Sequence, residues 1–124
     1  MIKQLASKEV EDYIKNNPKS VLLDVRTKEE WSKGKPDGDK VGLKTYFLSI
    51  QFADKTFNEN FIEDFKNLNI QKDTEILTMC MGGVRSQAVA ELLTKENYKC
   101  VNVSDGFLGN PENPGWKNSD LPCK

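Results

Sequence analysis

One segment combines a nucleophile, two adjacent glycines and a permanent positive charge: Cys80-Met81-Gly82-Gly83-Val84-Arg85-Ser86, here called the Cys80 loop. The chain contains no histidine. This excludes Ser-His-Asp and Cys-His catalysis as well as every histidine-ligated metal site. If Cys80 is a nucleophile, it is therefore activated by the local field and by hydrogen bonds rather than by an imidazole base.

The composition of the Cys80 loop predicts an anion-binding turn. A strand is expected to end just before it and a helix to begin near Ser86, so only a few residues reverse the chain. Gly82 and Gly83 permit the positive φ angles of such a turn, whose consecutive N–H groups can line one concavity. The helix N-terminus and Arg85 add positive charge, which favours a thiolate. A cysteine alone is more often a core residue, but the combination favours a site.

Strand and helix patterns alternate along the rest of the chain. Short apolar runs predict strands at residues 21–25, 75–79 and 100–103, and a strand with an irregular continuation within 46–52. Helices are predicted from Ser7 to 16, after a Thr27–Glu30 capping box, over 57–68 with Asn58 as the cap, and over 86–97. Residues 34–42 are predicted to form a loop and about 106–124 an irregular C-terminal wrap.

This alternation predicts an α/β fold with a mainly parallel sheet and helices on both faces. Sheets of this kind bind ligands beyond the carboxyl ends of their strands. Cys80 follows the strand predicted at 75–79, so the Cys80 loop is expected at that edge of the sheet.

The Cys80 loop resembles the active-site loop of rhodanese-domain sulfurtransferases, which has a Cys-x-x-Gly-x-Arg-Ser pattern. Residues 23–31, followed by Gly34, resemble the Asp-x-Arg…Glu-Trp/Tyr segment of that family. Residues 90–98 resemble its Ala-x-x-Leu…Gly-Phe/Tyr stretch, and 102–116 its closing Asn-Val…Gly-Gly…Gly-Trp elements. The resemblance extends over about residues 5–122.

The resemblance implies a rhodanese-like fold with a central five-stranded sheet. It also implies a sulfurtransferase in which Cys80 is catalytic and carries a persulfide. The sulfur would come from a small anionic donor such as thiosulfate and pass to a thiol or protein acceptor. The implied substrate-binding residues, through backbone N–H groups and the Arg85 side chain, are Met81, Gly82, Gly83, Val84, Arg85 and Ser86. Asp24 and Arg26 are implied to support the site through ion pairs beneath it.

The chain departs from the family pattern around the expected rim of the pocket. Many members have Gly-His-Ile-x-Gly-Ala where this chain has Gly34-Lys35-Pro36-Asp37-Gly38. The closing Gly-Gly is replaced by Asp105-Gly106-Phe107, and residues 110–114 form an insertion. These departures affect the identity of the donor and acceptor more than the type of reaction.

Length, net charge and cysteine content limit the classes of partner, cofactor and location that we expect. We expect residues 1–124 to form a single domain. A net charge of −1 argues against a nucleic-acid partner, and no apolar run is long enough for a membrane partner. The N-terminus lacks a signal-peptide pattern, so a cytoplasmic location is expected. Three scattered cysteines predict neither a metal site nor a disulfide framework, and no cofactor is expected.

Two other functions remain open at this level. One is a catalytically silent rhodanese-like module for interaction or redox sensing. The other is a phosphatase or arsenate reductase on the same fold, although such relatives usually carry one more residue between Cys and Arg than separates Cys80 from Arg85. Cys100 is expected in the core. Cys123, in a tail expected to be mobile, could reach Cys80 as a resolving thiol or receive its sulfur.

Overall fold

The computed structural model describes all residues 1–124. Its strands are β1 (Lys3–Leu5), β2 (Ser20–Asp24), β3 (Lys44–Phe47), β4 (Glu75–Met79) and β5 (Lys99–Val103). Its α-helices are α1 (Val10–Asn16), α2 (Lys28–Ser32), α3 (Phe61–Lys66) and α4 (Val84–Lys95). Three short 3₁₀ helices are also present: η1 (Ser7–Glu9), η2 (Gly38–Val41) and η3 (Trp116–Asn118).

The five strands form one sheet in the order β1-β5-β4-β2-β3, and every neighbouring pair is parallel. The predicted α/β fold is therefore confirmed, with a sheet that is wholly rather than mainly parallel. Asp24 at the end of β2 lies opposite Met79 at the end of β4. The residues that follow these two strands consequently emerge side by side at the carboxyl edge of the sheet.

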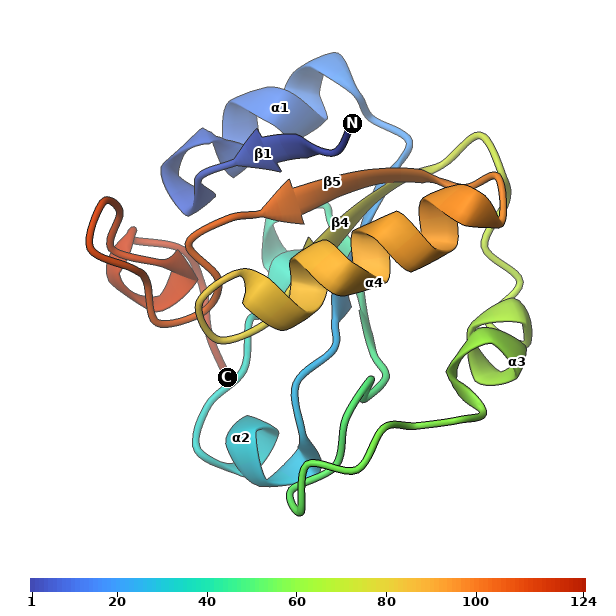
Figure 1. Cartoon of the computed structure of the whole chain (residues 1–124). Coiled ribbons are helices and arrows are strands. Elements are labelled where there is room, and N and C mark those ends of the chain that lie inside the picture. The colour runs from blue at the N-terminus through green and yellow to red at the C-terminus, as the bar shows by residue number, and fades with distance from the viewer.

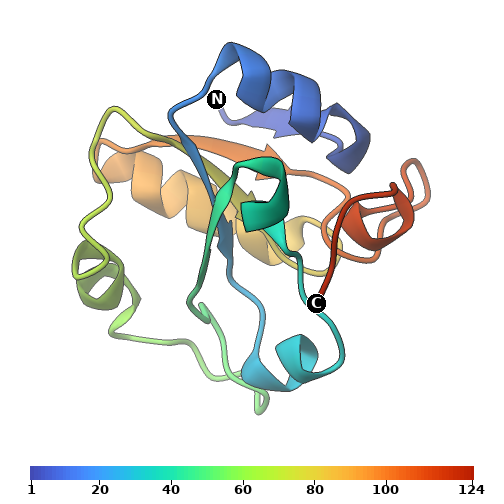
Figure 2. The same ribbon diagram turned by 180° about the vertical axis from the view of Figure 1, so that it is seen from behind.

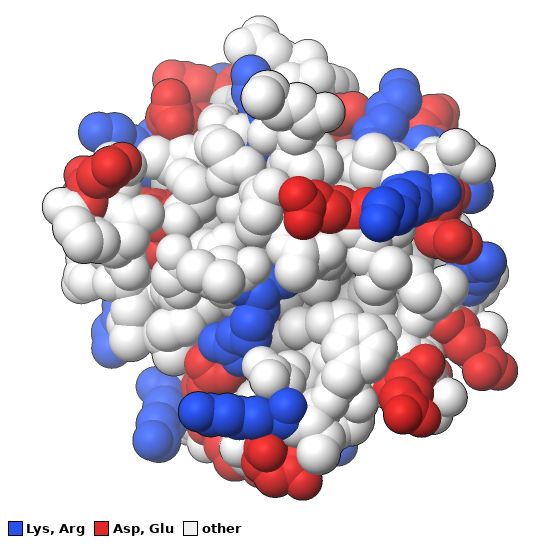
Figure 3. Space-filling model, viewed as in Figure 1, with Lys and Arg blue, Asp and Glu red and all other residues white.

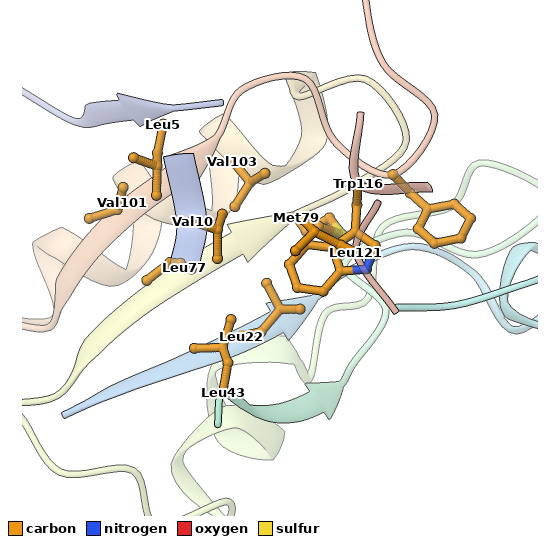
Figure 4. Packing of buried hydrophobic residues seen from close by; sticks show 11 residues of the cluster. Leu5, Val10, Leu22, Leu43, Leu77, Met79, Val101, Val103, Trp116 and Leu121 are labelled. Atoms are coloured by element: carbon orange, nitrogen blue, oxygen red, sulfur yellow. The ribbon is translucent and has the colours of Figure 1, made fainter. Parts of the chain in front are cut away.

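Side chains alternate between the two faces of the sheet and build two separate cores. Leu22 packs with α1 and the C-terminal segment on one face, in the cluster whose labelled residues appear in Figure 4. Leu23 packs with α3 and α4 on the other face, and α4 crosses the front of β4 and β5 in Figure 1. This alternation is the period-2 pattern of strands that are buried on both sides.

Local signals account for the helix starts that frame the site. Thr27 and Glu30 form the predicted capping box at the start of α2, with the Glu30 N–H donating to Thr27 Oγ1 over 3.1 Å. α4 begins at Val84, two residues before the predicted start, because Gly83 at φ 103° acts as its N-cap. The loop is thus shorter, and its last residues belong to the helix.

Three sequence predictions are corrected by tertiary context. β1 was not predicted, because only Leu5 of its three residues is buried. β3 begins at Lys44, two residues before the predicted start, and ends at Phe47, after which the chain continues irregularly as predicted. α3 begins later than expected, with Asn60 rather than Asn58 as its N-cap. The Asn58 side chain donates to Ser49 O over 2.9 Å and accepts from the Asn60 N–H over 3.1 Å.

The C-terminal segment wraps over the fold as predicted, but it is tied in place. Trp116 is fully buried, and its Nε1 donates to Pro122 O over 2.8 Å. Pro36 and Cys123 form an antiparallel bridge, and Lys124 exchanges two backbone hydrogen bonds with Lys35. Figures 1 and 2 both show the C-terminus against the segment that follows α2. Cys123 therefore does not lie in a mobile tail.

No helix combines the length and apolar character needed to cross a bilayer.

Candidate functional site

The Cys80 loop lies at the carboxyl end of β4, where the sequence predicted it. Cys80 is only 1% exposed, and two groups approach its sulfur. The Gly83 N–H donates to Sγ over 3.1 Å, and Ser86 Oγ lies 3.3 Å from it. The sulfur therefore faces the inside of the turn, toward the start of α4.

The backbone of the loop requires glycine at position 83. Gly83 has φ 103°, and a Cβ built there would lie 2.1 Å from Ser104 O. Gly82 has no such constraint, since its Cβ would meet nothing closer than Gly109 O at 3.6 Å. Of the two glycines that marked the loop in the sequence, Gly83 is the one that the geometry demands.

The segment after β5 holds the loop from behind. The Phe107 N–H donates to Cys80 O over 2.9 Å, and the Leu108 N–H donates to Met81 O over 3.1 Å. Gly106, at φ 61°, allows this close approach, because a Cβ there would lie 2.4 Å from Met81 O. The replacement of the family's Gly-Gly by Asp105-Gly106-Phe107 thus keeps the glycine that contacts the loop.

Arg85 is bound to a carboxylate from another element. Its Nη1 and Nη2 lie 2.8 and 2.9 Å from Oε1 and Oε2 of Glu30. Burial alone would raise the pKa of Glu30, but hydrogen bonds from Arg85 and Thr27 lower it from 4.5 to about 2. The hydrogen bond with Glu30 in turn raises the pKa of Arg85. The guanidinium of Arg85 is thus already paired with the Glu30 carboxylate. Its predicted role in binding a donor anion stays a prediction.

Asp24 and Arg26 lie buried at the end of β2 and pair with each other. Arg26 Nη2 is 3.0 Å from Asp24 Oδ2 and also donates to Gly34 O over 3.0 Å. The guanidinium carbon of Arg26 stands 4.3 Å from the centre of the Phe107 ring. Since the Phe107 N–H holds Cys80 O, the pair packs against a residue that contacts the loop. Its support of the site stays a prediction.

Two cavities adjoin the part of the Cys80 loop from Met81 to Val84, and a third lies beside the Arg85–Glu30 pair. Of the first two, the smaller, about 170 Å³, is lined by Met81, Phe107 and Leu108. Its charged lining residues are the paired Arg26 and Glu30 together with Lys33 and Lys117. Both lysines are exposed, and neither is in an ion pair. This cavity therefore offers unpaired positive charge beside the loop.

The larger cavity, about 370 Å³, has no charged lining residue. Its residues come from the loop, β1, β5 and α4: Gln4, Gly82, Gly83, Val84, Gln87, Asn102 and Ser104. In Figure 3 the surface above the start of α4, toward the adjoining strands, is largely uncharged, whereas basic side chains lie at and below the start of that helix. The two sides of the loop thus differ in charge.

The other cysteines have different surroundings. Burial raises the pKa of the Cys100 thiol to about 11, in keeping with its expected place in the core. Burial also raises the pKa of Cys123, which is exposed beside Pro36. No group of three or more Cys, Asp or Glu side chains is arranged to hold a metal ion.

Sequence reasoning did not assign two residues that the structure brings to the loop. Glu30 was noted only as part of a capping box and of a family pattern, yet it also binds Arg85. Asn102 appeared only within a family pattern, yet its side chain contacts both Ser86 and Gly83. A polar residue inside an apolar strand is the signal that could have marked Asn102.

Comparisons with known proteins agree with this architecture. The chain matches the family model of the rhodanese-like domain over residues 6–109. It is 37% identical over 124 residues to an uncharacterised protein of Rickettsia prowazekii, covering 98% of this chain and 97% of that protein. It is 34% identical over 104 residues to rhodanese-like domain-containing protein 17 of Arabidopsis thaliana, covering 83% and 62%. The crystal structure of Rv0390 from M. tuberculosis superimposes with a TM-score of 0.84 at 28% identity, covering 98% and 96%.

Proposed function

The chain belongs to the rhodanese-like domain family, and we propose that it is a sulfurtransferase that carries a sulfane sulfur as a persulfide on Cys80. The observation that carries this proposal is the position of the Cys80 sulfur. It lies inside a tight turn, 3.1 Å from the N–H of Gly83, at the start of a twelve-residue helix. Backbone donors and a helix N-terminus favour a sulfur anion at this point.

The proposed reaction has two displacement steps. The Cys80 thiolate attacks the outer sulfur of thiosulfate, the sulfur–sulfur bond of the donor breaks, and sulfite leaves with the bonding electron pair. A thiolate acceptor then attacks the terminal sulfur of the persulfide, and the Cys80 thiolate leaves. Backbone N–H groups between Met81 and Ser86 would stabilise the terminal sulfur. No external oxidant or reductant is needed.

Lys33 and Lys117 are better placed than Arg85 to attract an anionic donor. Arg85 is neutralised by Glu30, and Arg26 by Asp24. The two lysines have no such partner and line the cavity of about 170 Å³ that reaches the loop at Met81. Lys117 lies beyond residue 109, where the family match ends, so this part of the donor site would be particular to the chain and its near relatives.

The proposal is tested by incubating the protein and its Cys80→Ser variant with thiosulfate and recording intact masses without reductant. We expect one added sulfur atom in the wild type only, removed by cyanide or by a thiol. Cys123→Ser serves as the matched control and should gain sulfur like the wild type. Sulfur uptake by the Cys80→Ser variant, or none by a folded wild type at any donor concentration, would refute a Cys80 persulfide.

One observation favours a second candidate function, a silent module for interaction or redox sensing. Cys80 is 1% exposed, so a donor or acceptor has little access to its sulfur in this conformation. The same mass measurement separates the two candidates. A folded protein that takes up no sulfur but still binds small anions would favour the silent module.

A phosphatase is disfavoured by spacing. Four residues separate Cys80 from Arg85, one fewer than in phosphatase relatives that this loop resembles, which leaves less room for a tetrahedral oxyanion. Release of phosphate from an aryl phosphate, lost in Cys80→Ser, would overturn this conclusion.

A further inference from the structure

Three buried side chains stand in a row behind the Cys80 loop. Cys80, Ser86 and Asn102 are 1%, 0% and 2% exposed. Ser86 Oγ lies 3.3 Å from the Cys80 sulfur and 2.6 Å from Asn102 Oδ1. The hydroxyl thus has two neighbours, and it has one proton to donate.

The surroundings of Asn102 fix which of its atoms faces Ser86. Its Nδ2 lies 3.1 Å from Gly83 O and 2.9 Å from Gln4 Oε1. A backbone carbonyl only accepts hydrogen bonds, so the Asn102 atom facing Gly83 must be the amide nitrogen. The Asn102 oxygen therefore faces Ser86, and since that oxygen only accepts, the hydroxyl must donate to it.

This arrangement points the Ser86 proton away from Cys80. With the proton on the short bond to Asn102, only the lone pairs of Ser86 Oγ face the sulfur. Ser86 can then accept a hydrogen bond from a protonated Cys80 thiol, but it cannot donate to a thiolate. To stabilise the sulfur anion, the hydroxyl must turn and give up its bond to Asn102.

Two hydrogen bonds hold the side-chain amide of Asn102 in this orientation. Both hydrogens of its Nδ2 are used, one on Gly83 O and one on Gln4 Oε1. Gln4 is fixed in turn, because its Nε2 donates to Gln87 Oε1 over 2.6 Å at the surface of the larger cavity. A directed chain of hydrogen bonds, from donor to acceptor, therefore runs from Ser86 to Asn102 of β5, then to Gln4 of β1 and finally to Gln87 of α4.

We propose that Asn102 is a positioning residue that competes with Cys80 for the Ser86 proton and so withholds one hydrogen bond from the Cys80 sulfur in the resting protein. Ser86 turns to the sulfur when the anion forms. The charged groups near this row are two ion pairs, Arg85 with Glu30 from α2 and Arg26 with Asp24 from β2. The proposal concerns the reactivity of Cys80, the residue of the proposed function, and does not depend on sulfur transfer.

The test is the pH dependence of Cys80 alkylation by iodoacetamide, followed by peptide mass. Asn102→Leu removes the competing acceptor and frees the Ser86 hydroxyl for the thiolate. We expect the midpoint of the alkylation profile to fall by about one pH unit, which is about tenfold faster reaction below the midpoint. In a Ser86→Ala background the same Asn102→Leu change should move the midpoint little.

A matched control is Thr78→Val. The buried Thr78 hydroxyl bonds the backbone oxygen of Ser86 over 3.0 Å without touching its side chain, so its loss should leave the midpoint in place. If Asn102 is only structural, its replacement will slow alkylation at every pH or leave the midpoint unchanged, and the proposal fails. A rise of the midpoint also overturns it.

Gln4→Ala decides the question if Asn102→Leu does not fold. Gln4 lies on the edge strand β1, accepts a hydrogen bond from the Asn102 amide and makes none with Ser86 or Cys80. Gln4→Ala should lower the midpoint of the alkylation profile by less than Asn102→Leu does. The fall should be seen only in proteins that keep Ser86. An unchanged midpoint, or a fall that persists in Ser86→Ala, would exclude the competition. Because alkylation needs no sulfur donor, failure here is distinct from failure to form a persulfide.

Discussion

A single oxygen of Glu30 joins the start of α2 to the Cys80 loop: Oε1 lies 3.0 Å from the Thr27 backbone nitrogen and 2.8 Å from Arg85 Nη1. The carboxylate therefore completes the capping box of its own helix and neutralises the loop arginine at the same time. Two elements that are 55 residues apart in sequence depend on the ionisation of one group.

Glu30→Gln isolates the charge of this pair, because glutamine can still complete a capping box. We expect the variant to be less stable by about 1 to 2 kcal/mol at pH 7, since the pair is partly exposed. The pKa of Glu30 is lowered from 4.5 to about 2, so its contribution is present above pH 4.5 and is lost as the pH falls toward 2.

Urea unfolding at pH 7, 5, 4 and 3 measures this dependence. The difference between wild type and Glu30→Gln should be constant down to about pH 5 and then shrink. Glu29→Gln is the control, because Glu29 is exposed beside Glu30, and it should change stability by less than about 0.5 kcal/mol. A Glu30→Gln difference that stays constant to pH 3 would contradict the pairing.

The two glycines of the loop should respond differently to alanine. Gly83→Ala places a Cβ 2.1 Å from Ser104 O at φ 103°, and we expect it to cost more than about 2 kcal/mol and to abolish sulfur uptake. Gly82→Ala meets nothing closer than 3.6 Å and should keep both stability and uptake. Thermal unfolding and intact mass test the pair; equal tolerance at both positions would contradict the observed turn.

The exposed lysines of the smaller cavity should affect donor binding. In Lys33→Gln/Lys117→Gln we expect KM for thiosulfate to rise about threefold to tenfold with little change in kcat, because two unpaired charges are lost near the donor. The effect should weaken at high salt. Lys15→Gln/Lys95→Gln removes two exposed lysines that line neither cavity and should leave KM unchanged. An equal rise in both double variants would indicate only a general charge effect.

Cys100 should be unreactive in the folded protein. Burial raises its pKa from 9.0 to about 11, so at pH 8 its thiolate fraction is about a hundredfold below that of an ordinary thiol. Alkylation at pH 8 should therefore reach Cys100 only after unfolding in urea, as peptide masses would show. Comparable rates in the folded and unfolded protein would contradict this burial.

Patterns local in sequence predicted most of the fold, and contacts distant in sequence explain the misses. The apolar run of Glu75–Met79 gave the bounds of β4 correctly, and Thr27 with Glu30 marked the start of α2. Lys3–Leu5 carries almost no strand pattern of its own and becomes a strand because it pairs with Val101–Val103 of β5. Pairing of that kind cannot be read from three residues.

The site shows the same division. The position of Cys80 at the end of a parallel strand followed from the order of the elements. Two contacts could not be predicted from that order: the ion pair of Arg85 with Glu30 and the hydrogen bond of Ser86 with Asn102. Both contacts join residues of separate elements. From the sequence alone, each polar residue could equally have been exposed to solvent or paired.

The backbone hydrogen bonds that hold the Cys80 loop affect how this part of the protein can unfold locally. Phe107 and Leu108 belong to no helix or strand, yet their N–H groups donate to Cys80 O and Met81 O. Their amide hydrogens should exchange with deuterium about as slowly as those of β4, while the exposed turn around Glu112 exchanges rapidly. The rigid unit of this protein therefore extends past its last strand, and the turn that carries Cys80 can open only together with the centre of the sheet.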